Sequence, residues 1–250
     1  MNMKLTLIKK RVEAKGTKSF FWKSEKPVKY LPGQFFYYTL PSILYPDPRG
    51  ATRHFTLSSS PTEGELLRLT TRIRNESGFK RSLDKLEIGS IIEGEGPSGT
   101  FILDESDLSA QAGKGQHILL AGGIGITPFR SFIKYAIDKG LRETQIQLIY
   151  SNSQSEEIAF REELENWSKE NENIKVYLTV TSPTESKEKW SGLTGRIDEK
   201  MITSLIPKQY TLNATFWLCG SAPMVEAMEK ILGSLKITSD KLRSEKFTGY

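Results

Sequence analysis

A glycine-rich segment near the middle of the chain has the composition of a phosphate-binding turn. Residues 119–129 read LLAGGIGITPF, in which an apolar run leads through closely spaced glycines into a segment with helical spacing. Glycines in such a turn allow the backbone to approach a pyrophosphate, and the helix N-terminus supplies amide donors and a favourable dipole. The pattern is G-x-G-x-x-P and not the usual G-x-G-x-x-G. We predict that a dinucleotide binds at Gly122, Gly123, Gly125, Thr127 and Pro128.

The choice between NADH and NADPH depends on the residues that follow the next apolar run. An acidic residue at the end of that strand would bind the ribose 2′-hydroxyl, and an arginine would bind a 2′-phosphate. The sequence at 148–153 is LIYSNS, which contains neither. Ser151 can donate a hydrogen bond to either group, and Arg161 follows on the next predicted helix. The sequence leaves both nucleotides open and slightly favours NADH.

The single cysteine of the chain, Cys219, closes a third apolar run and is followed by Gly220. A helix is predicted to start near Pro223, so Cys219 would lie at the same sheet edge as the glycine turn. A soft, polarizable side chain there could position a nicotinamide ring, and a cysteine that only packs is the alternative. With only His54 and His117 beside it, the chain lacks the usual ligand sets for zinc or an iron–sulfur cluster, and no metal site is predicted.

Residues 53–56, which read RHFT, could bind a flat, anionic cofactor. On an alternating strand Arg53 and Phe55 share one face, while Thr56 points to the other. A guanidinium and an aromatic ring suit a pyrophosphate and a planar ring system. Ordinary decoration of a strand is the alternative explanation.

A second candidate phosphate site lies at 77–82, where a short helix is predicted to start. The segment from Ser77 to Ser82 would offer the amides of a helix N-terminus and two cations, Lys80 and Arg81, to a phosphate. An exposed basic surface is the alternative explanation.

The elements that must position these residues divide the chain into two halves. Up to about residue 104, short alternating apolar runs are separated by Gly, Pro, Asn and Asp, which is typical of antiparallel strands. Their frequent turns favour a small antiparallel β-barrel that is interrupted by one helix at 77–86. The predicted strands are residues 4–10, 19–22, 34–40, 53–58, 66–73 and 90–95.

After about residue 115, apolar runs without polar alternation are separated by segments of helical spacing. This pattern predicts βαβ units and a Rossmann-like α/β domain with a parallel sheet buried on both faces. Small residues at 109–115 indicate a linker, so we predict two domains, 1–110 and 111–250. The predicted strands are 117–121, 146–150, 174–180 and 215–219, and the predicted helices are 128–139, 156–169, 198–205 and 223–235.

The composition indicates a soluble globular protein. The 250 residues are 37% hydrophobic and 26% charged, with a formal net charge of +5 in which both signs are interspersed. We expect no nucleic-acid partner from so modest a charge. No apolar run approaches the roughly 20 residues of a membrane-spanning helix, and the first residues lack the apolar stretch of a signal peptide. We therefore expect no membrane span and a cytoplasmic location.

The motifs and their order resemble the ferredoxin-NADP reductase family over nearly the whole chain. Residues 53–56 match its R-x-[YF]-[ST] motif, and 96–101, GPSGTF, resemble its G-P-x-G-x-F motif. Residues 122–128 and 219–220 match its nicotinamide-dinucleotide motifs. The resemblance implies a flavin-binding barrel first and an NAD(P)-binding domain second.

The resemblance also implies roles for the residues of the first motif. Arg53 would meet the pyrophosphate of the flavin, Phe55 would pack on the isoalloxazine ring, and Thr56 would hydrogen-bond near the flavin N5 atom.

The last residues resemble the family's closing aromatic segment. Residues 245–250 read EKFTGY, so Phe247 and Tyr250 would lie against the flavin. Together with Thr56 and Cys219, Phe247 completes the set of predicted catalytic residues.

One departure from the family concerns the flavin phosphates. The usual G-x-x-[ST] motif is absent, and Ser77 and Lys80 stand at the corresponding positions. The resemblance favours FAD, and FMN is the alternative.

The function implied is that of a flavin-dependent NAD(P)H oxidoreductase. NADH or NADPH would give a hydride to bound FAD, and electrons would pass to a separate acceptor such as a ferredoxin or flavodoxin. A free-flavin or quinone reductase that uses a small acceptor is one alternative. A non-catalytic electron-transfer subunit of a larger complex is the other.

Overall fold

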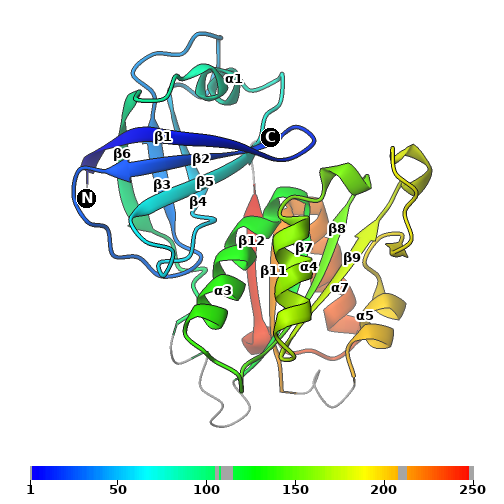
Figure 1. The fold of residues 1–250 in the computed structure, drawn as a ribbon. Helices are drawn as coiled ribbons and strands as arrows, with labels where there is room; N and C mark the ends of the chain where they lie inside the picture. Colours follow the sequence, from blue (N-terminus) through cyan, green and yellow to red (C-terminus); the bar gives the residue numbers. More distant parts are fainter. Residues whose placement is uncertain (1, 105–106, 108–114, 208–212, 248–250) are drawn as a thin grey trace.

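The computed structural model describes residues 2–104, 107, 115–207 and 213–247, which form two sheets (Figure 1). The first sheet is antiparallel, and the second is parallel and carries helices. The predicted fold class, an antiparallel β-barrel followed by an α/β domain, is confirmed. The predicted domain boundary at 110/111 and most of the predicted linker lie outside the described residues.

The first sheet has six strands in the spatial order β4-β3-β6-β1-β2-β5. Alternation along the first strand explains its inward face, because Met3, Leu5 and Leu7 are buried while Lys4 is exposed. A two-residue turn joins the first two strands at Gly16, whose φ of +69° favours glycine. The strands are β1 (Asn2–Ala14), β2 (Thr17–Ser24), β3 (Phe35–Thr39), β4 (Thr52–Thr56), β5 (Leu66–Arg72) and β6 (Ile91–Ser98).

The two edge strands of this sheet meet just beyond the end of β4. Leu57 forms an isolated bridge with Leu69, and the Ser58 amide donates to the Arg68 carbonyl oxygen over 2.8 Å. The sheet therefore curls into a barrel around a core that includes Phe20, Trp22, Phe36 and Tyr38. Helix α1 (Gly78–Lys85) follows β5.

The second sheet has six parallel strands in the order β10-β9-β8-β7-β11-β12. Alternate residues of its central strand enter two apolar clusters, Leu119 on one face and Ile118 on the other, so both faces are covered. The strands are β7 (Gln116–Gly122), β8 (Gln145–Asn152), β9 (Ile174–Val180), β10 (Leu193–Thr194), β11 (Thr215–Ser221) and β12 (Leu242–Phe247), and the helices are α3 (Ile126–Asp138), α4 (Arg161–Glu170), α5 (Glu199–Leu205) and α7 (Ala222–Ser234).

The clearest differences from the predicted elements are two strands that were not predicted and one helix that begins late. The short strand β10 was not predicted, and it pairs with β9. Strand β12 was not predicted, and it pairs with β11 at the edge of the parallel sheet. The helix predicted at 156–169 begins only at Arg161, because Phe160 has a φ of +61° that no continuous helix allows. In the part of the chain that the structure describes, no helix has the length and apolar character needed to cross a membrane.

Candidate functional site

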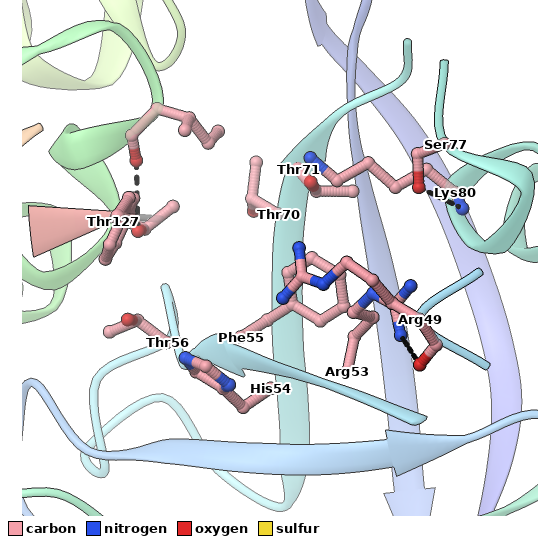
Figure 2. A pocket seen from close by; sticks show the side chains of 12 residues that line it. Arg49, Arg53, His54, Phe55, Thr56, Thr70, Thr71, Ser77, Lys80 and Thr127 are labelled. Carbon is pink, nitrogen blue, oxygen red and sulfur yellow. Dashed lines mark hydrogen bonds between the residues drawn. The ribbon is translucent and has the colours of Figure 1, made fainter. Parts of the chain in front are cut away.

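A pocket between the two domains, called here the inter-domain pocket, brings together most of the residues predicted in the first half (Figure 2). The barrel contributes one side and the segment after the glycine turn contributes the other, where Thr127 lies. The predicted residues that line it are Arg53, Phe55, Thr56, Ser77, Lys80, Thr127 and Phe247, and its other lining residues are Arg49, His54, Thr70, Thr71 and Ile124.

The barrel side of this pocket is strongly cationic. The Arg53 guanidinium is already fixed, because its Nη1 atom donates to the carbonyl oxygens of Arg49 over 2.7 Å and Gly50 over 3.1 Å, and its Nη2 atom pairs with Asp47. The Lys80 side chain is only 6% exposed. Burial and the neighbouring arginines, Arg74 and Arg49 first among them, lower the pKa of Lys80 to about 8. A bound pyrophosphate would relieve this repulsion, so the donor set fits that group.

The N-terminus of α1 is partly capped from within the protein. Asp47 accepts a hydrogen bond from the Phe79 amide over 2.9 Å and from the Ser77 hydroxyl over 3.3 Å. The Ser77 oxygen in turn accepts from the Lys80 amide over 3.2 Å. Burial opposes ionisation of Asp47, but these bonds outweigh it and lower its pKa. An anion in the pocket therefore meets side-chain cations more than the amides of this helix.

Ser82 does not line the inter-domain pocket. Its hydroxyl donates to the Gly78 carbonyl oxygen over 2.7 Å and accepts from the Leu44 amide over 2.9 Å. Ser82 thus joins α1 to the loop before Asp47 through hydrogen bonds. Tyr250 lies outside the described residues.

Aromatic side chains from both domains border the pocket. Phe55 packs against Tyr38 and Phe79, with ring centroids 6.0 Å and 5.9 Å away. Phe247 ends β12, where its register partner is Ser221 of β11. Two aromatic residues and a cation cluster together suit a planar ring that carries phosphates, as FAD does.

A second pocket, called here the glycine-turn pocket, lies at the carboxyl edge of the parallel sheet. The predicted residues that line it are Gly122, Gly123 and Ser151. It is also lined by Arg72, Arg74 and Ile124, by residues 152–153, Glu157 and Thr181, and by residues 196–198, 221, 223–224, 227–228 and 231. Ligands of open parallel sheets bind at this edge, so this pocket fits a nicotinamide dinucleotide.

Two glycines of the turn, Gly125 and Gly122, pack closely against β11 and α7. A Cβ atom on Gly125 would lie 2.2 Å from the Cys219 carbonyl oxygen, and one on Gly122 would lie 2.8 Å from the Met224 sulfur. Gly123 has open space around it but a φ of +52°, which favours glycine. The turn therefore brings α3, whose first turn includes Pro128, directly against the end of β11.

Arg161 was considered above for nucleotide choice, and the structure separates it from Arg196, another arginine of the second domain. Arg161 pairs with Glu165 over 3.0 Å and lies over the Trp190 ring, 5.2 Å from its centroid. Arg196 lines the glycine-turn pocket together with Ser151. Only Arg196 of these two is therefore placed to meet a ribose phosphate in that pocket.

Cys219 is completely buried beside the glycine turn, and Gly220 follows it against Met224. Cys219 pairs in register with Glu245 of β12. Burial and the nearby Glu245 carboxylate raise the pKa of the Cys219 thiol, which keeps it protonated. Cys219 lines neither pocket among the described residues, so this environment suits packing at the end of β11 and does not activate a nucleophile.

Glu245 is a titratable group that the sequence prediction missed. Its Oε2 atom is buried and has no hydrogen-bond partner among the described residues, and burial raises its pKa to about 7. Glu245 and Phe247 share one face of β12, since they are two residues apart on a strand. If residues 242–247 had been predicted as a strand, the two-residue spacing would have indicated that Glu245 faces the same side as Phe247.

Comparison with known proteins gives two family matches that together span most of the chain. Residues 4–102 match the Oxidoreductase FAD-binding domain, and residues 119–230 match the Oxidoreductase NAD-binding domain. The matched ranges contain the cation cluster of the first pocket and the glycine turn of the second.

The chain is also similar to individual proteins in sequence and in structure. NADH-cytochrome b5 reductase 1 of Aspergillus oryzae is 30% identical over 206 residues, which are 80% of this chain and 67% of that protein. The chain thus spans about two thirds of that relative's length. The cytochrome b5 reductase domain of Ulva prolifera nitrate reductase has the same fold, with a TM-score of 0.81 and 21% identity over 98% of this chain and 97% of that one. A ferredoxin NADP+ reductase from Neisseria gonorrhoeae with bound FAD and NADP gives a TM-score of 0.78 and 16% identity over 98% of each chain.

Proposed function

Because the chain belongs to the FAD- and NAD-binding oxidoreductases of the ferredoxin-NADP reductase and cytochrome b5 reductase type, we propose that it takes electrons from NADH and delivers them through FAD to a separate redox protein. Its class, an NAD(P)H-dependent flavoprotein reductase, follows from the family. The nucleotide and the acceptor are the proposal. The observation that supports it best is that motif residues from both halves of the chain line one pocket.

The residues of the inter-domain pocket fit FAD. Arg53 and Lys80 bring positive charge to the phosphates, while Phe55 and Phe247 offer aromatic faces to the ring. Thr56 is 5% exposed and can donate its hydroxyl proton to a ring atom. FAD, when bound, accepts a hydride from a reduced nicotinamide and can pass electrons on singly.

The residues of the second domain hold and orient the nicotinamide nucleotide. The glycine turn admits its pyrophosphate at the N-terminus of α3. Cys219, with a neutral and fully buried thiol, supports the ring through its packing at the end of β11, and packing of the two domains excludes water. The Glu245 carboxyl holds a proton near pH 7 at the same sheet edge.

The spectrum of the purified protein tests the cofactor part of this proposal. Protein incubated with FAD and FMN should retain FAD after gel filtration and lose its visible flavin band when NADH is added without oxygen. Arg53→Ala should weaken FAD binding about tenfold or more, because a charge-assisted contact contributes about 1.5 to 3 kcal/mol. Arg142→Ala, on an exposed turn after α3, is the matched control and should bind FAD like the parent. Absence of any retained flavin would refute the proposal.

The acceptor is tested by rapid mixing of the NADH-reduced protein with candidate acceptors. Ferredoxin, flavodoxin and cytochrome b5 should be reduced faster than free FMN or a quinone at equal concentration. The reverse order would support a small-molecule reductase. Slow reduction of every acceptor by the isolated chain, with a stoichiometric partner on purification, would instead support a subunit of a complex.

Nucleotide choice is tested at Arg196. The parent should use NADH at least as well as NADPH, since the end of β8 supplies Ser151 and no cation. Arg196→Ala should leave kcat/KM for NADH within about twofold and lower it for NADPH about tenfold or more, the effect of one lost charged contact. Arg161→Ala is the control and should change neither value. An equal effect of Arg196→Ala on both nucleotides would show that this side chain does not distinguish them.

A further inference from the structure

Arg130 on α3 is the buried centre of a partly exposed ion cluster that joins the two domains. Its side chain is 2% exposed. The Nη1 and Nη2 atoms donate to the Glu63 carboxylate over 2.7 Å and 2.9 Å, and the Nε atom donates to Glu163 over 2.7 Å. Glu63 belongs to the loop between β4 and β5 of the barrel, while Glu163 belongs to α4. The Arg130 guanidinium therefore joins α3 to α4 within the second domain and to the β4–β5 loop of the barrel.

Glu163 is the second centre of this cluster. Besides Arg130 it pairs with Arg11 of β1 over 3.0 Å and with Arg68 of β5 over 3.4 Å, both from the barrel. Burial opposes its ionisation, but the hydrogen bonds and charges of the arginines outweigh burial and lower the pKa of Glu163 to about 2. Phe160 covers the cluster, with its ring centroid 5.4 Å from the Arg130 guanidinium carbon.

The cluster lies within a few residues of both predicted cofactor-binding segments. Arg130 follows Pro128 of the glycine turn by two residues, and its Nη1 atom also donates to the Ser58 carbonyl oxygen over 2.7 Å. The neighbouring Ser131 hydroxyl donates to the Ser59 carbonyl oxygen over 2.7 Å. Ser58 itself follows Thr56 by two residues. Two side chains of α3 thus hydrogen-bond to the backbone that directly follows β4, the strand predicted to contact the flavin.

We propose that Arg130 is a positioning residue for hydride transfer, which sets the separation between the nicotinamide held by the glycine turn and the flavin held by β4. This proposal rests on the proposed function. Arg130 lines neither pocket among the described residues, so it acts through Ser58 and through α3. A guanidinium that bonds two carboxylates and a carbonyl fixes direction as well as distance.

Stability alone is a weaker explanation for this arrangement. Buried ion pairs add little net stability compared with apolar side chains of similar volume, because their desolvation is costly. Transfer rates respond steeply to geometry, and a misplacement of about 1 Å can cost about a hundredfold. The contacts of Arg130 between the two cofactor sites should therefore affect the rate of hydride transfer more than they affect stability.

The experiment uses Arg130→Lys in the full chain loaded with FAD. Lysine keeps the charge but loses the planar fork that bonds both carboxylates. In anaerobic stopped-flow mixing with NADH, the limiting rate of flavin reduction should fall about tenfold or more, while the apparent Kd for NADH stays within about twofold. The long-wavelength charge-transfer absorbance between nicotinamide and flavin should also weaken. Arg161→Lys changes the same residue type in an exposed pair with Glu165, and it should reduce at the parental rate.

A second variant protects the test against misfolding of the first. Ser131→Ala removes only the contact to the Ser59 carbonyl oxygen, which also accepts from the Tyr30 hydroxyl over 3.2 Å. It should lower the limiting rate about threefold with an unchanged Kd for NADH. A parental limiting rate in folded Arg130→Lys overturns the proposal, and so does a parental rate in Ser131→Ala if the lysine variant does not fold. Failure of the parent itself to bind flavin or to be reduced would refute the proposed function instead.

Discussion

Glu245 is the single side chain whose ionisation should matter most in the ordinary pH range. Its pKa is raised to about 7 by burial, whereas in an unfolded chain it would be near 4.5. The folded protein therefore binds more protons between these values, and the stability that the protonated carboxyl contributes is complete below about pH 4.5 and is lost as the pH rises through 7. Glu245→Gln should remove this loss and raise the free energy of unfolding at pH 8 by about 1 to 3 kcal/mol.

Urea titrations of flavin-free protein between pH 4.5 and 8.5 measure this effect. The parent and the glutamine variant should diverge with rising pH. Parallel stability curves would mean that Glu245 is ionised at its ordinary pKa in solution.

Cys219 should assist the reaction by positioning the end of β11 under the nicotinamide site and not by covalent chemistry. The side chain is fully buried, and both burial and Glu245 raise its pKa. Cys219→Ala should retain FAD and fold like the parent but reduce the flavin more slowly in stopped-flow experiments, and Cys219→Ser should be intermediate. Reduction of the alanine variant at the parental rate would mean that the packing of Cys219 has no effect on the position of the nicotinamide.

Single residues of the site were predictable where a short motif holds them together. Arg53, Phe55 and Thr56 are consecutive or alternate on one strand, so the sequence alone placed them on defined faces. Asp47 and Glu245 were missed, because each acts through a partner that only the fold brings near. Asp47 contacts Arg53 and α1 from a loop. Glu245 lies beside Cys219 because β12 pairs with β11.

At the scale of secondary-structure elements, the contact between the glycine turn and β11 should be intolerant of any side chain. Gly125→Ala would place a Cβ atom 2.2 Å from the Cys219 carbonyl oxygen and 2.7 Å from the Gly220 amide nitrogen, and backbone atoms cannot turn aside. We expect a loss of about 1 to 3 kcal/mol in the free energy of unfolding and weaker NADH binding.

Gly233→Ala is the matched control for this substitution. Gly233 lies in α7 with no atom within 4 Å of an added Cβ, so alanine should stabilise the protein by about 0.5 to 1 kcal/mol. Urea unfolding of both variants makes the comparison. Equal stability of the two variants would show that the turn moves away from β11 at little cost.

Elements with a strong apolar pattern were predicted well, and the exceptions have tertiary causes. Strand β12 has the sequence LRSEKF, with only two apolar residues, and is recognisable mainly by its pairing with β11. Helix α4 starts late because Phe160 turns its ring to the guanidinium groups of Arg68 and Arg130, 4.6 Å and 5.4 Å away. Packing around the ion cluster thus overrides the helical spacing of the preceding residues.

For the whole molecule, the shared ion cluster and the shared pocket predict that the two domains unfold together. Calorimetry of the flavin-free protein should give one transition. FAD at about one hundred times its Kd should shift that transition as a unit, adding about 2.7 kcal/mol of stability. Two transitions, with only the first-half transition moved by FAD, would mean that the cluster does not couple the domains in solution.

The lowered pKa of Lys80 also makes this side chain a site for selective chemical labelling. Near pH 8 about half of its amine is neutral, whereas an ordinary lysine amine is only about 0.3% neutral at that pH. A neutral amine is a nucleophile, and the surrounding arginines attract phosphate, so pyridoxal phosphate followed by borohydride should modify Lys80 ahead of most surface lysines. Peptide mass spectrometry would then read occupancy of the flavin site directly, since bound FAD should shield this one lysine from the label.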